Sequence, residues 1–147
     1  MNKILVAAIT LTLAMPMHAQ MTPVGNWKTV DDRSQKPRSV VKISETAETL
    51  TGVILERLDD GAKPSDVCDK CSDDRKNRLL KGLQIIRGVG LTSNGAGRWE
   101  GGRILDPESG KEYRVQLTPI EGGGKLEVRG FVGTPWIGRT QVWIRAE

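Results

Sequence analysis

The sequence predicts an all-β protein, an eight-stranded antiparallel up-and-down β-barrel. Apolar residues alternate with polar ones over about eight short stretches, which is the period-2 pattern of half-buried strands. The chain of 147 residues has 17 glycines and 7 prolines but only 4 tryptophans, 1 tyrosine and 1 phenylalanine. This composition favours short strands and turns over long helices, and the length suits one domain. Closing the strands into a barrel would remove the exposed sheet edges.

Residues 1–19 come before the first strand and have the order of a secretory signal peptide. Lys3 precedes an apolar stretch over residues 4–15, and Pro16 and the small residue Ala19 follow. The stretch is too short to span a bilayer, which disfavours the alternative of an uncleaved anchor, and no other window is long enough for a transmembrane helix. We therefore expect a single domain of residues 20–147, exported to the periplasm or secreted.

Removal of the leader limits the chemistry that the protein can perform. The only histidine, His18, leaves with it, and so does Lys3, which lowers the formal net charge from +4 to +3. The processed chain therefore has no imidazole for a Ser-His-Asp, Cys-His or histidine-zinc site. No motif supports a carboxylate-pair or lysine-based mechanism, so we do not expect an enzyme. Neither a cofactor nor nucleic-acid binding is indicated, because the basic residues are scattered and lack interleaved aromatic side chains.

The predicted strands follow one another along the processed chain. They cover residues 25–30, 39–44, 49–57, 82–89, 97–105, 111–118, 125–132 and 139–145. Residues 106–110 and 118–124 are rich in glycine and proline and predict hairpin turns, so successive strands should run antiparallel. Gly101-Gly102 lies inside a strand and predicts a bulge or sharp bend.

Alternation within the strands predicts which side chains face the core. Tyr113, Val115 and Leu117 share one face of their strand, and the intervening residues are polar. Leu126 and Val128 follow the same pattern. The last strand divides into Thr140, Val142 and Ile144 on one side and Arg139, Gln141, Trp143 and Arg145 on the other, so Trp143 is expected on the charged face.

Gly25-Asn26-Trp27, at the start of the first predicted strand, resembles the Gly-x-Trp signature of lipocalins and the wider calycin group. The resemblance implies that the tryptophan closes one barrel end beneath an arginine from the final strand. Arg139 and Arg145 are the two candidates, and we expect Arg139 to pair with Trp27.

A resemblance that covers nearly the whole processed chain is to an exported bacterial family named domain of unknown function 2147. It rests on blocks at residues 22–32, 68–71, 81–83, 99–113, 126–133 and 138–143, among them Cys68-Asp-Lys-Cys71 and Trp99-Glu-Gly-Gly-Arg103. The resemblance implies a periplasmic, lipocalin-like barrel, and no activity comes with it.

Cys68 and Cys71 lie in the longest predicted connection, residues 58–81, which is rich in charged residues. In an oxidising compartment two cysteines at this spacing can form a disulfide, which is the interpretation we favour. A redox motif would need the start of a helix after a strand, and a metal site would need carboxylate ligands, since no histidine remains. A bridge across so short a segment should shape the loop rather than hold the barrel together.

Two functions remain open. The first is a binding protein that takes a small apolar ligand, such as a fatty acid or lipid, in the barrel, with Trp99, Tyr113, Phe131 and Trp136 among its lining residues and an arginine for a carboxylate head group. The second is an interaction protein whose barrel is filled by its own side chains and whose loops, chiefly residues 58–81 and 133–138, contact an envelope protein. Eight strands enclose an interior of about the size that side chains can fill or that can hold one small ligand.

Overall fold

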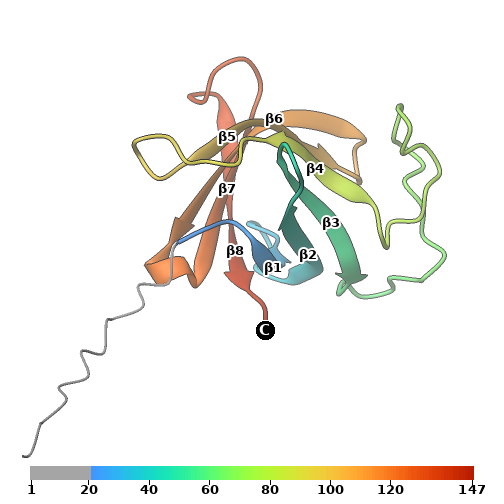
Figure 1. The fold of residues 1–147 in the computed structure, drawn as a ribbon. Coiled ribbons are helices and arrows are strands. Elements are labelled where there is room, and N and C mark those ends of the chain that lie inside the picture. Colours follow the sequence, from blue (N-terminus) through green and yellow to red (C-terminus); the bar gives the residue numbers. More distant parts are fainter. Residues whose placement is uncertain (1–20) are drawn as a thin grey trace, which may run out of the picture.

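The protein is a closed β-barrel, described by a computed structural model over residues 21–147. Each strand pairs antiparallel with the next, and the last strand pairs with the first (Figure 1). The strands are β1 (Gly25–Val30), β2 (Pro37–Glu45), β3 (Leu50–Arg57), β4 (Gln84–Val89), β5 (Trp99–Asp106), β6 (Lys111–Ile120), β7 (Lys125–Phe131) and β8 (Gly138–Arg145), and a 3-10 turn, η1 (Glu121–Gly123), joins β6 to β7. The predicted all-β, eight-stranded antiparallel barrel is confirmed. The signal peptide predicted at residues 1–19 lies outside the described residues.

The predicted strands differ from the observed ones only at their ends. The fourth strand begins at Gln84 rather than at Gly82, because Gly82 has a positive φ of 87° and its backbone N–H donates to the Ile54 carbonyl from outside the ladder. The sixth extends to Ile120 and includes Pro119, which lies opposite Leu126.

A bulge in β5 lets the barrel bend, as the paired glycines predict. The register between β5 and β6 shifts between Trp99 and Gly102. A Cβ atom on Gly102 would lie 2.4 Å from the Arg87 carbonyl oxygen and 2.6 Å from Val89 Cγ2. Only glycine therefore allows β4 and β5 to approach this closely.

The inner face of β8 is the one that carries the charged residues. Trp143 is buried at 2% exposure, whereas Val142 and Ile144 are 40% and 44% exposed on the outside. Trp143 does share a face with Arg139 and Arg145, but that face points into the barrel. The two arginines lie at opposite ends of β8, one at each end of the barrel.

The core fills one end of the barrel more completely than the other. Around the start of β1 and the end of β8, here named the closed end, side chains exposed by 2% or less pack together: Trp27, Ile43, Leu50, Leu117 and Leu126. The opposite end, here named the mouth, is formed by the end of β1, the start of β8 and the loops beside them. No helix of residues 21–147 has the length and apolar character needed to cross a membrane.

Candidate functional site

Trp27 seals the closed end beneath Arg145. The indole is fully buried, and its Nε1–H donates to the Pro23 carbonyl oxygen at 2.7 Å. The Arg145 guanidinium carbon lies 4.2 Å from the centroid of the tryptophan ring. A cation stacked on an indole contributes about 0.5–2 kcal/mol and shields the ring from water.

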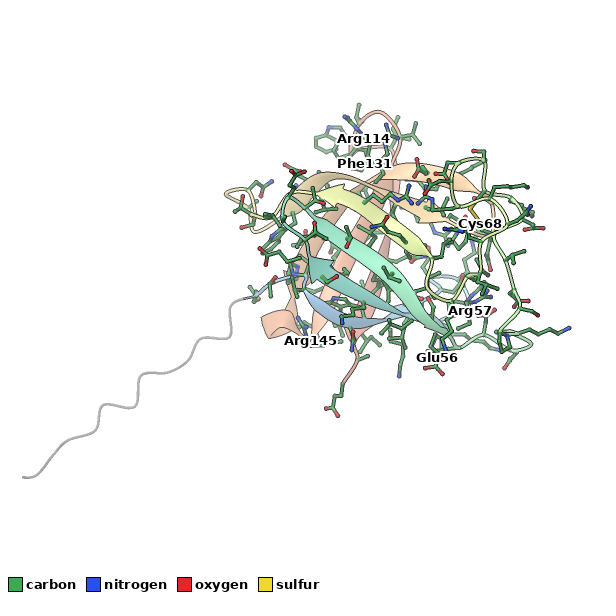
Figure 2. All side chains as sticks on the ribbon, turned by 45° about the vertical axis from the view of Figure 1, so that its right-hand side comes forward. Glu56, Arg57, Cys68, Arg114, Phe131 and Arg145 are labelled. Carbon is green, nitrogen blue, oxygen red and sulfur yellow. A yellow bond between two sulfur atoms is a disulfide. The ribbon has the colours of Figure 1, made fainter. Side chains whose placement is uncertain are left out.

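The expectation that Arg139 pairs with Trp27 is wrong. Antiparallel pairing of β1 with β8 places Trp27 opposite Arg145, at the end of β8, whereas Arg139 lies at the start of that strand. Arg139 forms an ion pair with Asp32 in the β1–β2 turn instead. Figure 2 shows Arg145 at the end of the barrel opposite Phe131.

Arg145 also ties the chain together at the closed end. Its Nε donates to the Gly123 carbonyl oxygen at 2.6 Å, and its two terminal nitrogens donate to the carbonyl oxygens of Val24 at 3.1 Å and Thr22 at 3.3 Å. A Cβ atom on Gly25 would lie 2.4 Å from an Arg145 nitrogen, and Gly25 has a φ of 138°. The positive φ therefore favours glycine at this position, and the missing Cβ leaves room for the arginine that covers the tryptophan.

The mouth opens into a cavity of about 1130 Å³. Its inner wall is mainly apolar and includes Ile54, Leu80, Ile85, Leu105, Val128 and Trp143. These side chains come from β3, β4, β5, β7, β8 and the connection between β3 and β4, so the barrel wall and this connection form the apolar part of the cavity. Small-molecule sites are mainly apolar and usually measure about 300–1,000 Å³, so this cavity has room for one small ligand.

Few uncharged polar side chains reach the cavity. Thr29 Oγ1 and Ser39 Oγ lie 3.0 Å apart in a buried hydrogen bond between β1 and β2. Gln141 Oε1 accepts a hydrogen bond of 3.1 Å from the indole N–H of Trp143. These four polar side chains therefore hydrogen-bond in pairs within an inner wall that is mainly apolar.

Three arginines line the outer part of the cavity, and each has a carboxylate partner. Arg38 contacts Asp31 at 4.0 Å and also forms an ion pair with Glu108 of the β5–β6 turn. The other two pairs are Arg57 with Asp59 and Arg139 with Asp32.

These pairs fix the charge state of the carboxylates at the rim. The hydrogen bond from Arg139 holds the pKa of Asp32 below its usual value, and the one from Arg57 does the same for the pKa of Asp59. The pKa of Asp31 is lowered mainly by hydrogen bonds from Ser34. The rim therefore carries several ion pairs beside an apolar interior, together with the charged side chains of Asp66, Asp69, Lys70 and Asp106.

Two of the four aromatic residues predicted to line the site do so in the structure, and two do not. Tyr113 and Phe131 both line the cavity. Trp99 is not among the lining residues: it lies nearer the closed end, is 8% exposed, and donates its indole N–H to the Leu91 carbonyl at 3.2 Å. Trp136 is not among them either, because it stands 91% exposed in the loop between β7 and β8.

Most of the apolar lining was not predicted from the sequence. Ile54 and Val128 were available from the alternation of the strands, which marks inward-facing residues, whereas alternation put Trp143 on the charged face of the last strand. Alternation does not show which inward residues face empty space, since that depends on how the loops cover each end.

One side of the mouth is covered by residues 58–83, here named the cap loop. Cys68 and Cys71 form the predicted disulfide, with a Cα–Cα distance of 5.4 Å, and both are buried. A backbone bridge joins Val67 to Leu79, and Leu80 contributes to the core. The cap loop is thus a folded part of the cavity wall rather than a flexible connection.

Arg75 anchors the cap loop to the barrel. This side chain is buried, forms ion pairs with Asp73 and with Glu112 of β6, and donates to the Gln84 carbonyl at 3.0 Å. The hydrogen bonds from Arg75 lower the pKa of Asp73 to about 2. The turn after β5 also packs against the loop, since a Cβ atom on Gly110 would lie 2.0 Å from the Lys70 carbonyl oxygen.

The other side of the mouth is formed by residues 132–137, here named the hairpin tip. It projects from the barrel between β7 and β8 (Figure 1). Val132, Trp136 and Ile137 are 65%, 91% and 72% exposed, and Val132 and Ile137 also line the cavity opening. Within residues 21–147, no three histidine, cysteine or acidic side chains gather as a metal site.

Comparison with known proteins agrees with this geometry. A family model described as "Uncharacterized protein conserved in bacteria (DUF2147)" matches residues 25–145. A solved structure with a TM-score of 0.71 is described as "Protein HP1028 from the human pathogen Helicobacter pylori belongs to the lipocalin family". That structure is 21% identical to this chain, and the match covers 84% of this chain and 82% of that one, which shows a shared lipocalin-like fold. No curated protein matches the chain.

Proposed function

The chain belongs to the DUF2147 family, and we propose that it is a non-enzymatic binding protein that holds a small apolar ligand, such as a fatty acid or another lipid, at the mouth of its barrel. The observation that carries this proposal is the cavity of about 1130 Å³ with its apolar inner wall. Water in such a space finds few hydrogen-bond partners, so an apolar group that replaces it gains from being removed from solvent.

The arrangement of polar groups supports a ligand with an apolar body and a polar head. The body would contact the apolar wall, and the head would lie among the paired charges of the rim. Arg38 suits a carboxylate head, because one of its partners, Glu108, comes from a turn and has a side chain 65% exposed. An incoming carboxylate can replace Glu108 while that residue moves into water.

The same proposal places the protein in the periplasm or outside the cell. Its support is the signal-peptide pattern of residues 1–19 together with the Cys68–Cys71 disulfide, since such bonds persist in oxidising compartments. Fractionation of cells that express the full chain tests this point. Processed protein in the periplasmic or culture fraction is expected, and unprocessed protein retained in the cytoplasm would contradict it.

Titration with a fluorescent fatty acid, such as dansylated undecanoic acid, tests ligand binding directly. We expect saturable binding of about one probe per chain, and displacement by unlabelled fatty acids. Ile104→Trp places a larger side chain in the cavity lining and should weaken binding by about tenfold or more. Leu55→Trp adds the same bulk at a position 38% exposed on the outer wall and should leave binding unchanged.

Two results would argue against the proposal: no saturable binding, or equal binding by the two tryptophan variants. The second candidate is a protein that binds an envelope partner through its loops, and the exposed hairpin tip favours it. The cavity argues against the filled barrel that we expected to accompany that function.

A further inference from the structure

The hairpin tip exposes apolar side chains in a fixed shape. Ile137 N–H donates to the Thr134 carbonyl at 3.1 Å, and Thr134 N–H donates to the Val132 carbonyl at 3.0 Å. Arg129 holds the tip from the barrel wall by donating to the Pro135 carbonyl at 2.8 Å. The exposure of Trp136 therefore belongs to a hydrogen-bonded turn. Contiguous exposed apolar side chains on a soluble protein mark a surface that another surface covers.

A row of arginines leads across the outer wall to the base of this tip. Arg87 of β4 pairs in register with Arg103 of β5, and Arg103 pairs with Arg114 of β6. Arg114 is in turn opposite Phe131, the last residue before the hairpin tip. Figure 2 places Arg114 and Phe131 together at the base of the projecting loop. We name Arg87, Arg103 and Arg114 the arginine row.

The arginine row has an unbalanced positive charge. Like charges directly opposite each other on neighbouring strands destabilise a sheet. Arg87 is neutralised by Asp74, with two N–O distances of 2.9 Å. Arg103 and Arg114 have no carboxylate within 4.0 Å in the part of the chain that the structure describes. Two adjacent uncompensated cations on one wall indicate that an anionic surface approaches there.

We propose that the hairpin tip and the arginine row together dock the barrel onto the surface of a membrane rich in anionic phospholipids. Trp136 and Ile137 would enter the interface between head groups and acyl chains, and Arg103 and Arg114 would contact the phosphate-bearing head groups. The chemistry of the pair distinguishes a bilayer from a soluble anion, because a soluble anion would leave the apolar tip in water. This inference goes beyond the proposed function and does not depend on what the cavity binds.

The position of the tip gives the docking a consequence. Val132 and Ile137 line the cavity opening, so a barrel seated on its hairpin tip holds its mouth beside the membrane. An apolar tip beside a row of cations matches the acyl and phosphate layers of an anionic bilayer, which favours a bilayer over a protein partner. An apolar ligand could then pass between membrane and cavity over a short distance.

Flotation with lipid vesicles and tryptophan fluorescence test the docking. The barrel domain, residues 20–147, contains every strand and core residue of the described structure and avoids any effect of the leader. Trp136 is the natural reporter, because Trp27, Trp99 and Trp143 are 0%, 8% and 2% exposed. We expect vesicles of equal phosphatidylglycerol and phosphatidylcholine to bind the domain and shift its emission to shorter wavelength, and vesicles of phosphatidylcholine alone to do so weakly.

Two variants that lose the same charge at different places test whether vesicle binding depends on the arginine row or only on net charge. R103Q/R114Q should weaken binding by about tenfold to thirtyfold, since each basic residue near an anionic surface contributes about fivefold. K28Q/K42Q removes the same charge from exposed positions on β1 and β2, across the barrel, and should change binding by much less. Raising the salt concentration should weaken binding of the unmodified domain.

Variants that replace exposed apolar side chains with serine test whether vesicle flotation depends on the hairpin tip in particular. W136S/I137S should abolish flotation, whereas L55S, at an exposed position on β3, should not. Ile104→Trp, which obstructs the cavity, should dock normally, so failure of ligand binding and failure of docking are distinguishable. The proposal is overturned if the anionic vesicles neither bind the domain nor shift its fluorescence, a result that would point to a protein partner for the tip. It is also overturned if R103Q/R114Q binds the vesicles no more weakly than K28Q/K42Q does.

Discussion

The two arginines of β8 make different kinds of contact at the two ends of the barrel. At the closed end, Arg145 stacks on Trp27 and donates to three backbone carbonyls, so its charge helps to complete the fold. At the mouth, Arg139 meets only an exposed carboxylate, Asp32, beside a large cavity. The closed end is filled with buried side chains and cross-linked by hydrogen bonds, whereas the mouth is hollow and has ion pairs at its rim. We therefore expect side chains at the closed end to contribute more to the stability of the barrel than those at the mouth.

The largest expected effect comes from comparing aromatic residues at the two ends. Trp27→Ala should lower the free energy of unfolding by about 3–5 kcal/mol, because it leaves a large hole in close-packed surroundings. Tyr113→Ala, at the edge of the existing cavity, should cost about 1–2 kcal/mol. Urea denaturation followed by circular dichroism measures both. Equal losses would show that the mouth is as tightly packed as the closed end.

Arg75→Met tests whether the cap loop depends on its buried anchor. The change leaves Asp73 and Glu112 without their buried partner and should cost about 2–4 kcal/mol. Amide hydrogen exchange should also become faster in residues 58–83 than in the closed end. Arg78→Met, at an exposed position in the same loop, is the matched control and should cost little. Uniformly faster exchange over the whole barrel would contradict a local role for Arg75.

The two arginines of β8 provide the next comparison. Arg145→Gln should cost about 1–3 kcal/mol, since it removes the stacking on Trp27 and the hydrogen bond to the part-buried Gly123 carbonyl. Arg139→Gln removes an exposed pair and should cost less than about 1 kcal/mol. Thermal unfolding of the two variants under one buffer condition gives the ranking. A larger loss of stability for Arg139→Gln than for Arg145→Gln would contradict the stacking of Arg145 on Trp27.

The smallest effect is a dependence of stability on pH through Asp73. Its pKa is about 2 in the folded protein, against an ordinary value of 3.8, so the folded state favours the ionised carboxylate. The resulting stability is fully present above about pH 4 and is lost as the pH falls towards 2. Asp73→Asn should flatten this part of the stability curve, as followed by urea denaturation at a series of pH values. An unchanged slope would mean that other carboxylates cause the acid sensitivity.

Much of the fold could be predicted from the sequence because it depends on local patterns. Alternation identified all eight strands, and Gly101-Gly102 identified the bulge in β5. The Cys68–Cys71 pairing needed only the short spacing and an oxidising compartment. Each of these features is decided by residues that are neighbours in the chain.

The features that were missed depend on contacts between distant parts of the chain. Choosing Arg145 over Arg139 requires the register of β1 against β8, since antiparallel closure puts the start of the first strand beside the end of the last. Trp99 was placed in the ligand site because it is aromatic, but it begins β5 and therefore lies towards the closed end. The cavity itself exists because the cap loop covers one side of the mouth without filling it, which strand periodicity does not encode.

The central claim, that the mouth of the barrel holds a small apolar ligand, is tested most directly by native mass spectrometry of protein purified from the cells that naturally produce it. Whatever is bound is then released by denaturing extraction and identified by small-molecule analysis. We predict a stoichiometric complex with a lipid or similar molecule, lost in Ile104→Trp and kept in Leu55→Trp. Empty protein that also fails to bind the fluorescent fatty acid would contradict the claim.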